Sequence, residues 1–173
     1  METVTNGAKI IGPGEVRDGF LGSIGVRFLI DGHETAERFS LVEHPMSPRA
    51  LAAPLHLHTR EDEYSFVLEG RMGALLGDEV VYAEEGDLVH KPRDQWHTFW
   101  NAGDEPCRIL EIIAPGGFER YFAEIVEAAA AGPLDPAWAA RTCARYGLEI
   151  DAASIPGLCE RFGLTFGPVA TRS

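Results

Sequence analysis

Two histidines and a glutamate stand close together near residue 60, and their types and spacing suit metal binding. His56 and His58 are separated by one residue, and Glu63 follows five residues later. Side chains of a strand alternate between its two faces, so both imidazoles leave one face, with Cα atoms roughly 6.7 Å apart. Glu63 begins a β-rich segment, residues 64–68, so its carboxylate can join the histidines from the next strand.

A fourth donor comes from a second stretch, residues 86–101. There a glycine turn leads into a short strand, Pro92 interrupts it, and His97 follows inside an aromatic run. Three imidazoles and a carboxylate suit a divalent transition ion. The sequence therefore predicts a metal site made of His56, His58, Glu63 and His97. These ligands suit iron, manganese, nickel, cobalt, copper and zinc, so the identity of the ion stays open.

The two stretches resemble the two motifs of the cupin superfamily. The first motif is matched by His56, His58, Glu63 and Gly70, with Ala50 in place of its first glycine. The second is matched by Gly86, Pro92, His97 and Asn101, with Asp94 in place of its middle glycine. Both departures fall at turn positions, so they concern loop geometry rather than the metal site. The resemblance implies an all-β cupin fold, a double-stranded β-helix or jelly-roll barrel, with C-terminal helices.

The length and charge of the chain limit its domain number and the classes of partner that it can bind. A chain of 173 residues with 45% hydrophobic content can bury a real core, and we expect one domain over residues 1–173. The formal charge of -12 repels nucleic acids and anionic membranes. No signal peptide and no spanning run of ~20 apolar residues is recognisable, so we expect a cytoplasmic protein. Three cysteines without a C-x-x-C pair predict reduced thiols.

Alternation and turn residues predict a barrel core over about 23–114. Residues 23–30 read as a strand ending at the turn Asp31-Gly32, and 37–43 as another, with Pro45 arguing against a central strand. Residues 64–68 and 71–76 flank Glu69-Gly70 and predict a hairpin. Further strands are expected at 79–83, 88–90, 96–101 and 107–114.

A helical extension is expected over about 118–173. Apolar residues recur at helical spacing over 118–131. Asp135 caps a second helix, 136–146, which ends at Gly147. The tail, 148–173, allows a short helix around Leu158 or a partly mobile segment.

Other polar residues are interpreted as structural. His33 and His44 are expected to stay outside the site, whereas the sequence leaves open whether His90 lines the cavity. The acids Glu61, Asp62, Glu84 and Glu85 are expected to be solvated. The basic run 91–93 is too short to indicate an anion site. Alternation places Phe99 on the face of His97, together with Val67 and Met72 near the cavity, and Trp96 and Trp100 on the opposite face.

The resemblance implies a metal-dependent enzyme acting on a small organic molecule, similar to single-domain cupin dioxygenases of the flavonol-cleaving kind. Glu63 would then be both a metal ligand and a catalytic base. Redox-neutral cupins, namely isomerases, lyases and cyclases, use the same residues, and a non-catalytic small-molecule-binding cupin is the third alternative. Pairing through barrel edges, common in this superfamily, implies a homodimer.

Overall fold

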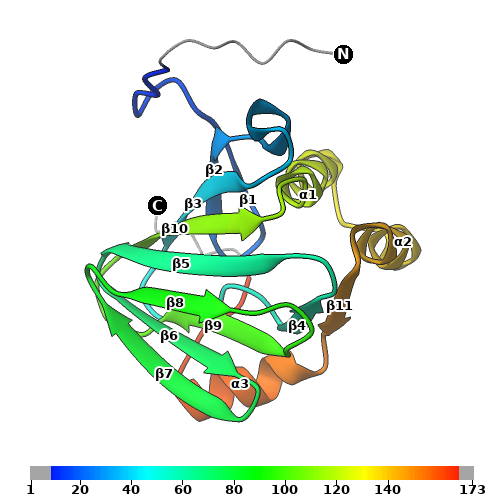
Figure 1. Ribbon diagram of the computed structural model, residues 1–173. Helices are drawn as coiled ribbons and strands as arrows, with labels where there is room; N and C mark the ends of the chain where they lie inside the picture. The colour runs from blue at the N-terminus through cyan, green and yellow to red at the C-terminus, as the bar shows by residue number, and fades with distance from the viewer. Residues whose placement is uncertain (1–8, 168–173) are drawn as a thin grey trace.

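Two antiparallel sheets face each other in the computed structural model, which describes residues 9–167 (Figure 1). The six-stranded sheet has the order β1 (Arg17–Phe20), β2 (Gly25–Ile30), β3 (Ser40–Met46), β10 (Cys107–Ala114), β5 (Asp62–Glu69), β8 (Leu88–Lys91). The five-stranded sheet has the order β11 (Leu148–Asp151), β4 (Leu55–His58), β9 (His97–Asn101), β6 (Arg71–Leu76), β7 (Glu79–Glu84). The predicted all-β barrel with C-terminal helices is confirmed.

The helices follow the barrel, apart from a short 3-10 turn, η1 (Gly32–Thr35). They are α1 (Glu119–Ala131), α2 (Pro136–Tyr146) and α3 (Ser154–Phe162). As predicted, the Asp135 carboxylate accepts hydrogen bonds from two free amides at the start of α2, and Gly147 ends it with a φ of +67°. Within residues 9–167 no helix is long and apolar enough to cross a membrane.

The helices close different parts of the barrel (Figure 1). Phe122 and Val126 of α1 pack with Val26, Val42 and Ile113 of the six-stranded sheet. Beneath the five-stranded sheet, the Trp100 ring stacks on Phe162 of α3, with ring centroids 4.3 Å apart. Trp100 therefore belongs to the face opposite the donors, as expected. The helices α1 and α3 pack into separate apolar clusters.

The predicted hairpin around Glu69-Gly70 is wrong. β5 pairs with β10 and β8, whereas β6 pairs with β9 and β7, so the chain crosses from one sheet to the other at this turn. Gly70 has a φ of +79°, and a Cβ there would lie 2.7 Å from the Pro106 carbonyl oxygen. A glycine turn between two apolar strands looks alike in sequence whether the chain folds back within a sheet or crosses between sheets. By contrast, β6 and β7 do pair across Gly77-Asp78.

The prediction that Pro45 argues against a central strand is also wrong. Pro45 belongs to β3, which lies between β2 and β10. The register of β2 against β3 reaches Glu43 but not Pro45, which is paired with Arg108 of β10 alone. Its missing amide hydrogen therefore removes no bond of the β2–β3 ladder. β2 and β3 pair as expected, although η1 replaces the predicted tight turn.

The tail holds both an expected and an unexpected element. α3 contains Leu158, which is buried as predicted. Residues 148–151, for which the sequence predicted no strand, form β11. This strand pairs with β4 at four positions, including Leu148 with His58 and Ile150 with His56. β1 precedes the predicted barrel core of residues 23–114, and residues 1–8 lie outside the described part. The three cysteines are free thiols, as expected.

Candidate metal centre

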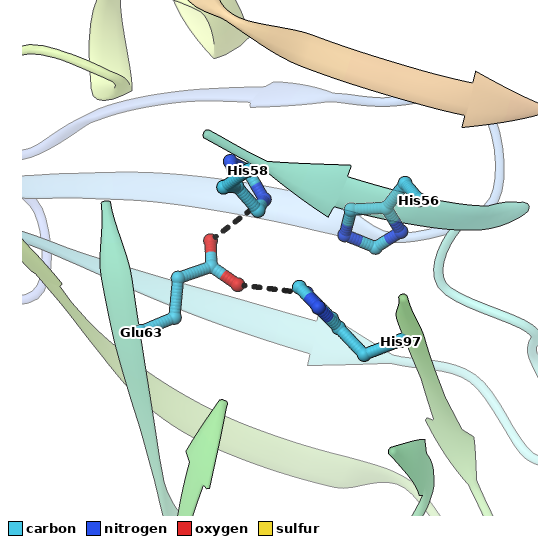
Figure 2. Close-up of side chains that lie close together, drawn as sticks. All are labelled: His56, His58, Glu63 and His97. Atoms are coloured by element: carbon cyan, nitrogen blue, oxygen red, sulfur yellow. Dashed lines mark ion pairs between the residues drawn. The ribbon is translucent and has the colours of Figure 1, made fainter. Parts of the chain in front are cut away.

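Four side chains that can bind a metal converge inside the barrel (Figure 2). His56 and His58 come from one face of β4, Glu63 from β5 and His97 from β9. One donor atom of each lies within 4.8 Å of the others, and all four residues are buried. The predicted residues are thus brought together by both sheets, because alternation sends the β4, β5 and β9 side chains into the space between them.

The imidazole tautomers suit metal binding. His56 Nδ1 lies 2.8 Å from the Pro54 carbonyl oxygen, and His97 Nδ1 lies 2.9 Å from that of Gln95. Since a carbonyl only accepts, each Nδ1 carries the hydrogen, and each Nε2 keeps a lone pair. The Nε2 of His97 is buried and has no hydrogen-bond partner among residues 9–167. A lone pair left unpartnered in this way fits a ligand atom.

Glu63 lies between two of the histidines. Its Oε1 is 3.5 Å from His58 Nε2, and its Oε2 is 3.4 Å from His97 Nε2 (Figure 2). The far side of His58, its Nδ1, faces Glu61 Oε2 at 3.7 Å. Glu61 is therefore buried behind a donor, and the prediction that it is solvated is wrong. Asp62, whose side chain is one-quarter exposed, instead pairs with Arg93 at 2.8 Å.

Protonation states agree with this arrangement. Burial holds the pKa of His56 well below its usual range, and a proton on a neighbouring imidazole of the cluster would lower it further. Burial also lowers the pKa of His97, against the opposing effect of Glu63. For Glu63, burial raises the pKa, but Lys91, His58 and His97 outweigh it and hold the pKa well below its usual range. At neutral pH His56 and His97 are therefore neutral and Glu63 is ionised, the forms that bind a cation.

A buried charge network that the sequence did not reveal stands behind Glu63. Lys91 is 1% exposed, and its Nζ lies 2.9 Å from Glu63 Oε2 and 3.0 Å from Glu111 Oε2. Ser65 Oγ donates to Glu111 Oε2 at 2.9 Å. Burial raises the pKa of Glu111 to about 7, although Lys91 opposes this. The available signal was strand parity: Val89 and Lys91 of β8 point inward, and Leu88 and His90 point outward.

Two further histidines, His90 and His44, were considered in relation to the cavity. His90 does not line the cavity, because it is exposed and stacks on Tyr64 with ring centroids 4.8 Å apart. His44, expected outside the site, lies on the cavity wall. It points inward because it alternates with the buried Val42 and Met46 along β3.

A mostly apolar cavity of about 130 Å³ adjoins the donors. Phe99 lines it as predicted, whereas Val67 and Met72 pack in the core and are not among its lining residues. Phe118, Tyr121 and Phe122, at the start of α1, supply an aromatic side that the sequence analysis did not assign to the cavity. Phe118 also contacts the His58 ring edge-on, with centroids 4.4 Å apart.

The one departure from the second motif has a structural explanation. Asp94, which replaces a glycine, adopts a φ of +60°, so the turn keeps the left-handed conformation that favours glycine. The Asn101 side-chain amide donates to the carbonyls of Ser47 and Glu105, at 3.0 and 2.7 Å. These contacts hold the loops beside β9 together.

Comparisons with known proteins agree with the geometry. A family model described as a cupin domain matches residues 43–113. Oxidoreductase iacF of Pestalotiopsis fici is 31% identical over an alignment of 106 residues, and the match covers 54% of this chain and 52% of that protein. The chain thus spans about half the length of this curated relative.

Solved structures share the fold. The polyketide cyclase RemF of Streptomyces resistomycificus is 31% identical, with a TM-score of 0.54 over 62% of this chain and 79% of that one. A predicted oxalate decarboxylase of Thermotoga maritima superposes with a TM-score of 0.57 over 62% of this chain and 99% of that one, at 16% identity. The matched domain, the two facing sheets and the motif residues identify this chain as a member of the cupin superfamily.

Proposed function

We propose that this protein is a metal-dependent enzyme that acts on a small, ring-containing organic molecule. The observation that carries the proposal is the convergence of four buried donors, within 4.8 Å of one another, beside an apolar cavity. His56, His58, Glu63 and His97 would hold one divalent ion. When bound, the ion would supply Lewis acidity to an enol or phenol oxygen.

The protein's own residues would do the rest. Glu63, which is ionised and lines the cavity beside the histidines, would accept the proton released from the substrate hydroxyl. The aromatic side chains of Phe99, Phe118 and Phe122 would pack on the ring and exclude water. Cavities of about 150 Å³ lined by apolar side chains hold a benzene molecule. A cavity of about 130 Å³ therefore favours a substrate whose reacting part is a single ring.

The reaction class that we favour is a dioxygenase-like oxidoreductase. A donor set of three imidazoles and one carboxylate suits redox-active ions such as iron, manganese and copper. The 31% identity to a protein named as an oxidoreductase supports this class.

A redox-neutral cyclase is the second candidate. The same four residues would serve it, and the solved relative named a polyketide cyclase is also 31% identical to this chain. In that case the ion is needed only to polarise an oxygen, and molecular oxygen has no role.

One experiment separates the candidates. The protein is purified without added ions, its metal content is measured by mass spectrometry, and phenols, enols and cyclisable polyketones are supplied with and without oxygen. Oxygen-dependent turnover supports the dioxygenase, and equal anaerobic turnover supports the cyclase. A protein that binds no divalent ion, even when ions are supplied, would refute both.

We also propose that the chain is a single domain, with a barrel core over 23–114 and an extension over 118–173, and that it forms a homodimer. Light scattering at micromolar concentration tests the dimer, because a monomer mass would contradict it. Location in the cytoplasm stays a prediction from the sequence.

A further inference from the structure

His44 is a buried polar side chain on the cavity wall that the proposed metal chemistry leaves unused. It lies on β3, opposite Ile109 of β10, and is 2% exposed. Its ring packs against two aromatic cavity residues, with centroids 5.4 Å from Phe122 and 6.2 Å from Phe99. The imidazole therefore places a polar group between two aromatic side chains of the cavity.

The tautomer of His44 is fixed by the backbone. Nδ1 lies 2.9 Å from the Gly25 carbonyl oxygen, which can only accept, so Nδ1 carries the hydrogen. Burial lowers the pKa of His44 to about 4, so the ring is neutral at physiological pH. The other nitrogen, Nε2, is then a hydrogen-bond acceptor. Among residues 9–167, the hydrogen bonds of His44 engage Nδ1 alone.

The Nε2 acceptor of His44 is not sealed inside the core. Its residue lines the cavity, and the atom stays accessible there, so it can accept a hydrogen bond from a molecule that enters. A phenylalanine would fill similar space but offer no acceptor, as Phe99 and Phe122 do beside it. The placement of His44 thus points to a partner that enters the cavity.

We propose that His44 determines specificity, its Nε2 accepting a hydrogen bond from a substrate hydroxyl remote from the oxygen bound at the metal centre. β10 separates β3 from the strand of Glu63, which places the two strands about 10 Å apart at the usual spacing. The substrate class is then a compact ring that carries two oxygen functions. The contact between one substrate oxygen and the metal depends on the proposed function. The contact between the second hydroxyl and His44 depends only on the position of His44 in the cavity.

Three substitutions divide the roles of the two ring nitrogens. His44→Asn keeps an amide that can donate to Gly25 but moves the acceptor away from the position of Nε2. His44→Gln places an amide oxygen near the position of Nε2. His44→Phe keeps the ring shape and removes both polar groups. Tyr121→Phe is the matched control, because Tyr121 also lines the cavity and, among the described residues, its hydroxyl forms a hydrogen bond only with Cys143 Sγ, at 3.7 Å.

The probes are hydroquinone, 4-methoxyphenol and phenol, titrated calorimetrically under nitrogen into zinc-loaded protein. All three have a hydroxyl for the metal, but hydroquinone alone has a second donor. We expect the wild-type protein to bind hydroquinone roughly tenfold more tightly than either analogue, beyond the twofold statistical advantage of two equivalent hydroxyls. His44→Phe and His44→Asn should lose this preference, His44→Gln should retain part of it, and Tyr121→Phe should keep it.

Equal binding of the three probes by the wild type overturns the role of His44. So does a preference for hydroquinone that survives in both His44→Phe and His44→Asn. Loss of this preference in Tyr121→Phe overturns it as well. Thermal melts show which variants are folded, and the Asn and Gln variants decide the question if Phe disrupts the wall. Zinc content is measured in parallel. A protein without zinc refutes the proposed function, and the preference for hydroquinone is then measured on the metal-free chain.

Discussion

Lys91 Nζ lies 2.9 Å from Glu63 Oε2, and both side chains are almost completely buried. The same ammonium group is 3.0 Å from Glu111 Oε2, so one cation separates two carboxylates inside the barrel. Since a buried charge is tolerated only when it is compensated, this ion pair ties the stability of the barrel to the carboxylate at its centre.

Replacing Lys91 by methionine should therefore destabilise the metal-free protein by about 3 to 5 kcal/mol, the usual cost of breaking a buried ion pair from one side. Denaturant unfolding monitored by circular dichroism measures this change. The double variant Lys91→Met with Glu111→Gln should recover part of the loss, because one of the two uncompensated carboxylates is removed. Arg49→Met serves as the control, since its pair with the exposed Asp104 should contribute less than about 1 kcal/mol. Equal losses for Lys91→Met and Arg49→Met would contradict the network.

Glu63→Gln separates a base from a ligand. The amide keeps the size of the side chain but cannot accept a proton, while three histidines remain. If Glu63 acts mainly as a base, the variant should keep its metal and lose about 10²-fold to 10⁴-fold in rate. If it acts mainly as a ligand, metal content should fall with the rate. His97→Ala should empty the site in either case, and full turnover by a metal-loaded Glu63→Gln protein would leave the acid-base role without support.

Acid should destabilise the metal-free protein through its buried histidines. The pKa of His44 is lowered to about 4 by burial, against about 6.5 when unfolded, so between these values the unfolded chain binds more protons. The stability contributed by neutral His44 is therefore full above about pH 6.5 and is lost as pH falls toward 4. It amounts to about 3.5 kcal/mol, at roughly 1.4 kcal/mol per pH unit. Glu111, whose pKa is raised to about 7 by burial, acts in the opposite direction, because there the folded chain binds the proton more tightly.

Unfolding free energies measured between pH 4 and 7 test this dependence. His44→Phe should flatten the curve, while His56 and His97, whose pKa values are also lowered, keep part of the slope. A curve for His44→Phe that parallels the wild type would show that His44 does not titrate in this window.

Chelation should lower the melting temperature. A metal that binds only the folded state adds about 2.7 kcal/mol of stability at a hundredfold excess over Kd. A melting curve that does not change after complete metal removal would count against the site. Binding should also weaken in acid, because protonated imidazoles cannot bind a cation. Since the pKa values of His56 and His97 are lowered, this weakening should begin below the ordinary histidine pKa of about 6.5.

The barrel could largely be predicted from the sequence, because alternation and turn residues are local signals. Which strands pair is not local. The turn at Gly70 joins strands of different sheets, and β11 pairs with a strand about ninety residues earlier, since Leu148 faces His58. The prediction for Pro45 failed for the same reason. Whether its missing amide hydrogen disrupts a sheet depends on where the neighbouring strand, β2, ends.

The convergence of the four candidate donors could be predicted, because their spacing carries the information. Lys91, Glu111 and His44 were not predicted, because a single polar residue in a strand has the same local sequence whether it faces solvent or the interior. Parity could have indicated Lys91, which alternates with Val89. Nothing local pairs Lys91 with Glu111, which lies on β10.

The pairing of β11 with β4 has a consequence for how such a site can change. β4 is matched to β9 only at His56 and His97 but to β11 at four positions, and Ser154 Oγ accepts a further hydrogen bond from the Leu55 amide. The strand that carries two of the donors is therefore anchored mainly by a segment outside residues 43–113, the part that matches the family model. Substitutions in the extension can shift the histidines relative to the rest of the barrel without altering any donor. Exchanging this segment between related proteins would accordingly retune reactivity while the motifs stay intact.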